Sequence, residues 1–257
     1  MGDSLKYRLP NGHVVEKTGA FKSVVFSEVT EGFMVASFDK SEVFLFEEGK
    51  SAVASKGFSK PVCYSHEEYV EKADLFVEEI RRKKLSKAIF SRVKEQASRK
   101  TAEQLFEDLN KAYPKAFVYL ISSAAFGTWV GATPETLVSC KNGMGRTISL
   151  AGTMKSDDRT EWGEKEQFEQ QFVSDFIEDQ LKSLSLTSIE KDGPKDRIAG
   201  PVKHLETTFQ FSLNNHRPIE IADQLHPTPA VSGLPQREAI ALIQSVETHK
   251  RLSLIHI

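Results

Sequence analysis

The longest regular pattern in this sequence is a helical one, which runs from residue 164 to residue 185. At about 100° per residue, the large apolar side chains of this segment fall on one stripe of the predicted helix. They are Phe168, Phe172, Val173, Phe176, Ile177 and Leu184. A helix with such a stripe is stable only where other elements cover it, so we expect this segment to pack into the core.

The same helical wheel places Glu169 near the middle of the apolar stripe. Burial of an unpaired carboxylate costs several kcal/mol, so we expect a cation, a metal ion or protonation to compensate it. A buried salt bridge and a metal ligand are both compatible with this pattern.

Strand patterns fill the first 60 residues and return later in the chain. Short apolar runs alternate with Gly, Asp and Glu turns, which is typical of antiparallel strands. The runs that predict strands are residues 24–26, 33–36, 43–46, 88–93, 117–121, 127–130, 136–140, 146–150 and 209–213. The chain is therefore expected to be a mixed α and β protein.

Capping signals mark further helices. Ser65 with Glu68 and Thr101 with Gln104 have the spacing of capping boxes, and Pro235 suits the first position of a last helix. Residues 186–200 contain Lys, Asp, Gly and Pro, and we interpret them as a connecting loop.

No linker rich in Gly or Ser separates two domains. We expect residues 1–60 to be a strand-rich part of the same fold as residues 61–251. Residues 252–257 form an apolar end without a polar terminus, and we interpret them as a non-native tail.

Composition excludes several classes of function. With 34 basic and 36 acidic residues the net charge is −2, so we expect neither nucleic acid nor a membrane surface as a partner. Cys63 and Cys140 are too few for a disulfide framework, and no apolar run suits a signal peptide or a spanning helix. We expect a cytoplasmic protein and a monomer.

Five short motifs occur in the order found in one enzyme family. They are Lys87-Ala88-Ile89-Phe90-Ser91-Arg92, Gly131-Ala132-Thr133-Pro134-Glu135, Leu150-Ala151-Gly152-Thr153, Lys165-Glu166-Gln167-Phe168-Glu169, and the run from His226 to Pro235. With these motifs the chain resembles the chorismate-utilising enzymes over about residues 60–251. The resemblance implies the α/β (α+β) chorismate-binding fold of the anthranilate synthase component I type, with two packed antiparallel sheets flanked by helices.

The resemblance also implies a reaction. Relatives that use ammonia usually have glutamine where this chain has Lys87, whereas relatives that use water have lysine. The implied activity is that of an isochorismate synthase, in which Lys87 takes a proton from the attacking water and Glu135 protonates the departing hydroxyl. Without the resemblance, the sequence favours a surface lysine at position 87 and an exposed turn residue at Glu135.

Other residues are implied as ligands of the substrate chorismate or of a metal. The small residues Gly152, Thr153, Ser232 and Gly233 lie at expected turns, where backbone N–H groups can approach an anion closely. Ala230 stands where amine-transferring relatives tend to have threonine, and His204 matches a family histidine near the substrate ring. The resemblance implies Mg²⁺ as cofactor, with Glu169 as one ligand, which suits a hard cation.

A second family glutamate lies beyond the end of this chain, so we expect an incomplete metal site and impaired turnover. Salicylate synthase, which also has the lysine and then eliminates pyruvate, is an alternative. A noncatalytic chorismate-binding module is another. Isochorismate could serve either menaquinone or siderophore biosynthesis.

Overall fold

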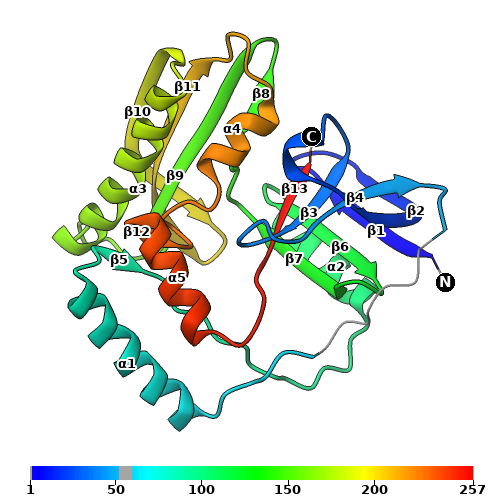
Figure 1. The fold of residues 1–257 in the computed structure, drawn as a ribbon, viewed down its shortest axis with the longest axis horizontal. Helices are drawn as coiled ribbons and strands as arrows, with labels where there is room; N and C mark the ends of the chain where they lie inside the picture. Colours follow the sequence, from blue (N-terminus) through cyan, green and yellow to red (C-terminus); the bar gives the residue numbers. More distant parts are fainter. Residues whose placement is uncertain (1, 52–59, 257) are drawn as a thin grey trace.

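Strands from both ends of the chain pair into a seven-stranded antiparallel sheet in the order β13-β3-β4-β2-β1-β6-β7 (Figure 1). The computed structural model describes residues 2–51 and 60–256, with the backbone alone for 252–256. The strands of this sheet are β1 (Asp3–Arg8), β2 (Val14–Ser23), β3 (Phe33–Ser37), β4 (Val43–Glu48), β6 (Phe117–Ser123), β7 (Gly127–Thr133) and β13 (Leu252–His256). Residues 52–59, which precede the expected boundary at residue 60, lie outside the described part.

The interior face of this sheet is largely aromatic. Alternate residues of β1 point to one side, so Leu5 and Tyr7 are both buried. Tyr7 packs against Phe33 with ring centroids 5.3 Å apart, and Phe21 meets Phe126 edge to face at 4.9 Å. The short η1 (Phe26–Glu28) follows β2, so the strand expected at residues 24–26 is wrong.

A second antiparallel sheet has the order β10-β11-β9-β8 and is covered on one face by α3 (Figure 1). Its strands are β8 (Ser139–Lys141), β9 (Met144–Lys155), β10 (Thr187–Ala199) and β11 (Val202–Ser212). The helix α3 (Glu164–Ser183) confirms the predicted helical segment. The core between them joins Val173, Ile177 and Leu181 of α3 to Phe209 and Phe211 of β11.

The buried face of α3 differs from the predicted apolar stripe. Phe168 is 60% exposed and Glu169 is only half-buried, whereas the polar Gln170 and Ser174 are buried. These two polar side chains form hydrogen bonds to the sheet below, and this rotates the buried face away from Phe168. The prediction that Glu169 lies in the middle of the buried stripe is therefore wrong.

The prediction of a loop at residues 186–200 is also wrong, because Thr187–Ala199 form strand β10. Among the described strands β10 is an edge strand that pairs with β11 alone, and its register shifts between Asp192 and Lys195. Pro194 lies within that irregularity, where no ladder hydrogen bond is required from it. Edge strands tolerate charged residues and Pro, which explains the loop-like composition.

The capping boxes predicted two helices correctly. Ser65 caps α1 (His66–Lys83) and Thr101 caps α2 (Ala102–Ala112), each with the reciprocal hydrogen bonds of a capping box. The last helix, α5 (Gln236–Val246), begins after Pro235. A further helix, α4 (Pro218–Leu225), was not predicted, although Pro218 at its start is a common first helical residue.

Two very short strands join α1 and α5 to the rest of the molecule. β5 (Lys87–Ala88) pairs with β12 (Gly233–Leu234) in a two-stranded sheet. The strand expected over residues 88–93 is therefore limited to its first residue, and the chain after Ala88 is irregular.

Beyond Arg251, β13 pairs with β3 rather than leaving the fold as a tail. Whether these residues are native stays a prediction.

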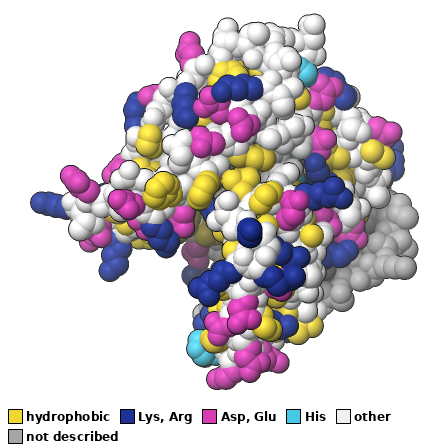
Figure 2. Space-filling model, turned by 60° about the vertical axis from the view of Figure 1, so that its left-hand side comes forward, with side chains coloured by type: hydrophobic (Ala, Val, Ile, Leu, Met, Phe, Trp, Pro, Cys, Tyr) yellow, Lys and Arg dark blue, Asp and Glu magenta, His cyan; other side chains and the backbone are white. Residues whose placement is uncertain are grey.

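The surface mixes charges of both signs. On the face seen in Figure 2, Lys and Arg side chains alternate with Asp and Glu, and hydrophobic side chains form separate small groups. This mixture agrees with a net charge of −2. Among the described residues, no helix combines the length and the apolar character that crossing a bilayer requires.

Candidate active site

Lys87 enters the site from the short strand β5. The preceding helix α1 ends at Lys83, its C-cap Lys84 turns the chain with a φ of 54°, and buried Leu85 then leads into β5. Burial lowers the pKa of Lys87, and the negative charges of Glu169 and Glu135 act in the opposite direction. The amine has no hydrogen bond or ion pair with any described residue, so it can take a proton from a ligand.

Glu135 lies in the connection between β7 of the larger sheet and β8 of the smaller one. It lines a cavity of about 490 Å³. By accessible surface Glu135 is an exposed residue, so the hollow that it lines covers only part of its side chain. Desolvation by the surrounding protein raises the pKa of Glu135, while electrostatic interactions with His204 and Lys87 oppose the shift.

The three groups that sequence reasoning placed together are thus electrostatic neighbours. Lys87, Glu135 and Glu169 come from β5, the β7–β8 connection and α3, and Lys87 interacts with both carboxylates. Burial moves the pKa of the lysine down and that of Glu135 up. A base with a lowered pKa and an acid with a raised pKa are suited to proton transfer near neutral pH.

A bulge in β9 brings Gly152, Thr153 and His204 together. His204 of β11 stands opposite two residues of β9, because Leu205 pairs with Ala151 while Lys203 pairs with Met154. Gly152 adopts a φ of +71° at this bulge. The ring Nδ1 of His204 lies 2.9 Å from the Gly152 carbonyl oxygen and 3.1 Å from Thr153 Oγ1. Bulges of this kind re-aim side chains and are frequent beside active sites.

Glu169 is held in place by its neighbour Gln170. The Gln170 side chain is 2% exposed, and its Nε2 donates to Ser149 Oγ at 2.8 Å and to Thr207 Oγ1 at 3.0 Å. Its Oε1 has no hydrogen-bond partner among the described residues. These contacts fix the rotation of α3 on the sheet and so direct the preceding Glu169 away from the core.

The predicted residues between Ala230 and Gly233 have different surroundings. Ala230 lines the cavity. Ser232 is 0% exposed, and its hydroxyl donates to the carbonyl oxygen of Thr228 at 2.9 Å. Gly233 has a φ of +137°, and a Cβ there would lie 2.2 Å from the Lys87 carbonyl oxygen. Ser232 and Gly233 therefore shape the strand pairing beside Lys87, and their contact with substrate stays a prediction.

The cavity also contains residues that sequence reasoning missed, namely Tyr119, Ser91, His226 and Arg251. Burial lowers the pKa of His226 to about 4, and the nearby Lys40 acts in the same direction, so its imidazole is neutral at physiological pH. Its Nε2 lies 3.1 Å from the Phe38 carbonyl oxygen. His226 begins one of the quoted motifs, but only the folded chain shows it at the cavity.

The described residues do not form a complete metal site. No group of three or more His, Cys, Asp or Glu side chains that could hold a metal is found among them. Glu169 offers one oxygen ligand, and Mg²⁺ sites usually combine one or two carboxylates with waters and substrate oxygens. The described residues therefore supply a partial donor set for Mg²⁺.

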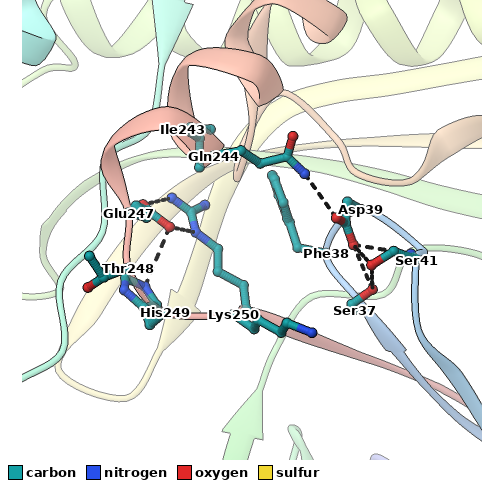
Figure 3. A pocket seen from close by; sticks show the side chains of 11 residues that line it. Ser37, Phe38, Asp39, Ser41, Ile243, Gln244, Glu247, Thr248, His249 and Lys250 are labelled. Atoms are coloured by element: carbon teal, nitrogen blue, oxygen red, sulfur yellow. Dashed lines mark hydrogen bonds and ion pairs between the residues drawn. The ribbon is translucent and has the colours of Figure 1, made fainter. Parts of the chain in front are cut away.

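A second cavity, of about 220 Å³, lies between the end of α5 and the turn after β3 (Figure 3). Asp39 in its wall accepts hydrogen bonds from Ser37 Oγ at 2.7 Å, Ser41 Oγ at 2.8 Å and Gln244 Nε2 at 2.9 Å. Burial opposes ionisation of Asp39, but the bonds from Ser37 and Ser41 outweigh it and lower the pKa. Because its carboxylate is already satisfied by the turn, this cavity lacks the acid and base of the first.

Comparison with known proteins identifies the same family as the motifs. The family model described as chorismate binding enzyme matches residues 28–253. The chain is 34% identical over 136 residues to the isochorismate synthase MenF of Bacillus subtilis. This match covers 48% of this chain and 29% of that protein. It is 27% identical over 158 residues to the isochorismate synthase EntC of Escherichia coli, covering 57% of this chain and 40% of that protein.

A solved structure shares the fold. The protein described as the 2,3-dihydroxybenzoate-specific isochorismate synthase DhbC of Bacillus anthracis superposes with a TM-score of 0.76 at 23% sequence identity. The superposition covers 98% of this chain and 79% of that one. The expected fold class is thereby confirmed, with curled antiparallel sheets and flanking helices. The matched segments span less than half the length of the two curated relatives.

Proposed function

The chain belongs to the chorismate-binding enzymes, and we propose that it acts as an isochorismate synthase, which converts chorismate to isochorismate. Relatives that carry this name support the proposal. The presence of lysine at position 87, where ammonia-using relatives usually have glutamine, favours water as the nucleophile.

The reaction adds water at one ring carbon and removes hydroxyl from another by an allylic shift. Lys87, in its neutral form, accepts a proton from the attacking water as the new carbon–oxygen bond forms. Glu135, in its protonated form, donates a proton to the departing hydroxyl, which leaves as water. One water molecule enters and one leaves, so the reaction is a net isomerisation, and transfer of the proton from Lys87 to Glu135 through solvent restores both groups.

The observation that carries this proposal is the shared electrostatic environment of the two groups. Burial favours the neutral amine of Lys87 and the neutral carboxyl of Glu135, the forms that a base and an acid need. The cavity of about 490 Å³ that Glu135 lines falls in the range of small-molecule sites. A single ring with two carboxylates is a suitable occupant.

The remaining site residues are proposed to bind and orient the substrate. His204, Gly152 and Thr153 form one group at the β9 bulge, and His204 acts electrostatically on Glu135. Ala230 leaves space in the cavity wall. Mg²⁺ stays a prediction with Glu169 as one ligand, and no proton transfer described above depends on it.

Product analysis tests the proposal. The purified protein is incubated with chorismate, with and without Mg²⁺, and the products are separated and identified by NMR. Isochorismate is the expected product. Accumulation of salicylate together with pyruvate would instead assign a salicylate synthase, and chorismate binding without any product would assign a noncatalytic module.

A further inference from the structure

The strand that carries Lys87 is held by very few backbone hydrogen bonds. β5 and β12 pair through Lys87 with Leu234 and through Ala88 with Gly233. The flanking amides extend the ladder, because Ser86 N donates to Leu234 O at 2.9 Å and Ile89 N donates to Ser232 O at 3.0 Å. A two-stranded sheet this short is at most marginally stable without further support.

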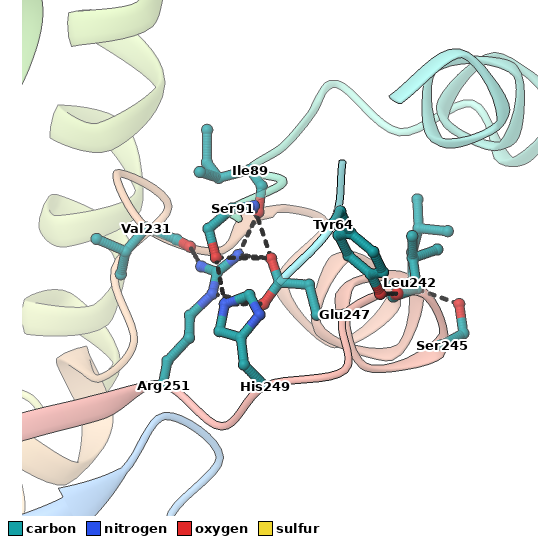
Figure 4. A network of polar contacts seen from close by, with 10 residues as sticks. Tyr64, Ile89, Ser91, Val231, Leu242, Ser245, Glu247, His249 and Arg251 are labelled. Carbon is teal, nitrogen blue, oxygen red and sulfur yellow. Dashed lines mark hydrogen bonds and ion pairs between the residues drawn. The ribbon is translucent and has the colours of Figure 1, made fainter. Parts of the chain in front are cut away.

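Arg251 supplies that support at the point where the backbone ladder ends (Figure 4). Its Nη2 donates to the Ile89 carbonyl oxygen at 2.6 Å, and its Nη1 donates to the Val231 carbonyl oxygen at 2.7 Å. Ile89 follows β5 and Val231 precedes β12, so one guanidinium group joins the two strands. The rigid, planar fork of arginine is suited to bonding both carbonyl groups at once.

Glu247 orients the guanidinium group of Arg251. Its Oε2 accepts from Arg251 Nε at 2.8 Å, and its Oε1 accepts from Arg251 Nη2, from Ser91 N at 2.7 Å and from Ser91 Oγ at 2.9 Å. The Glu247 side chain is 3% exposed and that of Arg251 is 15% exposed. A buried pair of this kind is strongly disrupted when one partner is removed.

The same cluster contains Ser91, His249 and a carboxylate, but not in the order of a hydrolytic triad. Ser91 Oγ lies 2.8 Å from His249 Nε2, and Glu247 Oε2 approaches that same nitrogen at 3.5 Å. His249 Nδ1 is buried and has no partner among the described residues. A triad requires the carboxylate at the nitrogen that does not face the serine. The cluster is therefore a structural connection and not a second hydrolytic site.

We propose that the Arg251–Glu247 pair is a positioning device for Lys87, which holds β5 against β12 and so keeps the amine beside Glu135 and Glu169. This inference rests on the proposed function, since it assigns the pair a part in the same reaction. Ile89, Ser91, Val231 and Arg251 line the same cavity as Glu135, so Arg251 forms part of its wall, whereas Glu247 lines the second cavity. Arg251 and Glu247 act through Lys87 and do not take part in the proton transfers themselves.

The test compares Arg251→Lys and Arg251→Gln with Lys250→Gln as the matched control, because Lys250 is exposed and makes only a surface ion pair with Glu42. The first readout is native-state hydrogen exchange of the Ser86 and Ile89 amides. We expect exchange of both amides to become about tenfold faster or more in the Arg251 variants, because the strands can then open without breaking the hydrogen bonds of the guanidinium group. Exchange of the Ile177 amide in α3 should stay unchanged, which separates local opening from global unfolding.

The second readout is steady-state turnover of chorismate. A displaced base lowers kcat by about 10²-fold while KM for chorismate changes little. The third readout needs no turnover: the rate at which acetic anhydride labels the Lys87 amine, relative to Lys94, should change in both Arg251 variants, because opening of β5 alters the exposure and the pKa of the amine. If Arg251→Gln does not fold, Arg251→Lys keeps a positive charge beside Glu247 and still lacks the planar fork that donates one hydrogen bond to each of the two carbonyl groups.

Unchanged exchange at Ser86 and Ile89 in a folded Arg251 variant would overturn the inference. So would faster exchange with unchanged kcat and unchanged Lys87 labelling, because the pair would then stabilise the strands without placing the amine. If the wild-type protein makes no isochorismate, the proposed function fails, and exchange and labelling still decide whether the pair holds Lys87.

Discussion

At the scale of single residues, the proposed reaction depends on the amine of Lys87. We predict that Lys87→Gln lowers kcat by about 10² to 10⁴, the usual contribution of a general base. KM for chorismate should change much less, because the amine is proposed to act on water rather than to bind the ring. Steady-state kinetics of Lys94→Gln, an exposed lysine outside the cavity lining, provides the control. Equal turnover in the Lys87 and Lys94 variants would remove Lys87 from the mechanism.

The raised pKa of Glu135 predicts that the stability of the folded protein depends on pH. Its pKa is raised above the ordinary value of 4.5, so the folded state binds more protons than the unfolded state between these two pKa values. Stability therefore falls as pH rises through this window, and the penalty persists at higher pH. Glu135→Gln lacks the titrating group, so we expect its melting temperature to exceed that of the wild type at about pH 8 and to approach it at about pH 4.

Thermal melts at both pH values, with exposed Glu31→Gln as the control, measure this difference. If the difference in melting temperature between Glu135→Gln and the wild type were the same at both pH values, the carboxyl would not be desolvated. Such a result would also remove the reason for its role as an acid.

At the scale of elements, the contact of β12 with β5 requires glycine at position 233. A Cβ at this position would lie 2.2 Å from the Lys87 carbonyl oxygen and 2.7 Å from Ala88 Cα, both backbone atoms. We predict that Gly233→Ala destabilises the protein by about 1–3 kcal/mol and lowers kcat, because the strands must separate.

Gly49→Ala is the matched control, since Gly49 also has a positive φ, of +70°, and apart from its chain neighbours no described residue has an atom within 4 Å of the position that a Cβ would take there. Urea denaturation measures both variants. A loss of stability no larger in Gly233→Ala than in Gly49→Ala would mean that backbone conformation alone, and not the approach of β5, requires the glycine.

The attachment of α3 to its sheet is the second prediction at this scale. Gln170→Ala removes the hydrogen bonds to Ser149 and Thr207, so buried Thr207 Oγ1 loses this partner, whereas Ser149 Oγ keeps its bond to Ser174 Oγ. We expect a loss of about 1–3 kcal/mol in the free energy of unfolding. Gln171→Ala, on the exposed side of the same helix, should be nearly neutral in the same urea titration. If both substitutions have the same small effect, the polar contacts do not fix the helix.

Local signals predicted some elements well and failed for others, and the reason is physical. Capping boxes at Ser65 and Thr101 act within one turn of a helix, so the sequence alone identifies them. β10 exists because β11 pairs with it, and its composition is that of an exposed edge, so no local pattern reveals it. On α3, the predicted apolar stripe did not include the polar residues Gln170 and Ser174, because their hydrogen-bond partners in the sheet are distant in sequence.

At the scale of the whole molecule, the site exists only where the two sheets and the β5–β12 pair meet. The motifs singled out Lys87, Glu135 and Glu169, and the fold makes them electrostatic neighbours. Sequence reasoning did not find Arg251, Glu247 or Ser91 as a group, because their connection spans more than 150 residues of chain. An i to i+4 pair such as Glu247 and Arg251 usually indicates only an exposed ion pair on a helix.

The most direct test of the whole account is the fate of solvent oxygen. Chorismate is incubated with the protein in water enriched in ¹⁸O, and the isochorismate formed is analysed by mass spectrometry. We predict one ¹⁸O atom in the new ring hydroxyl group, and loss of that product in Lys87→Gln. Isochorismate that contains no solvent oxygen would contradict the central claim that Lys87 activates water for attack on the ring.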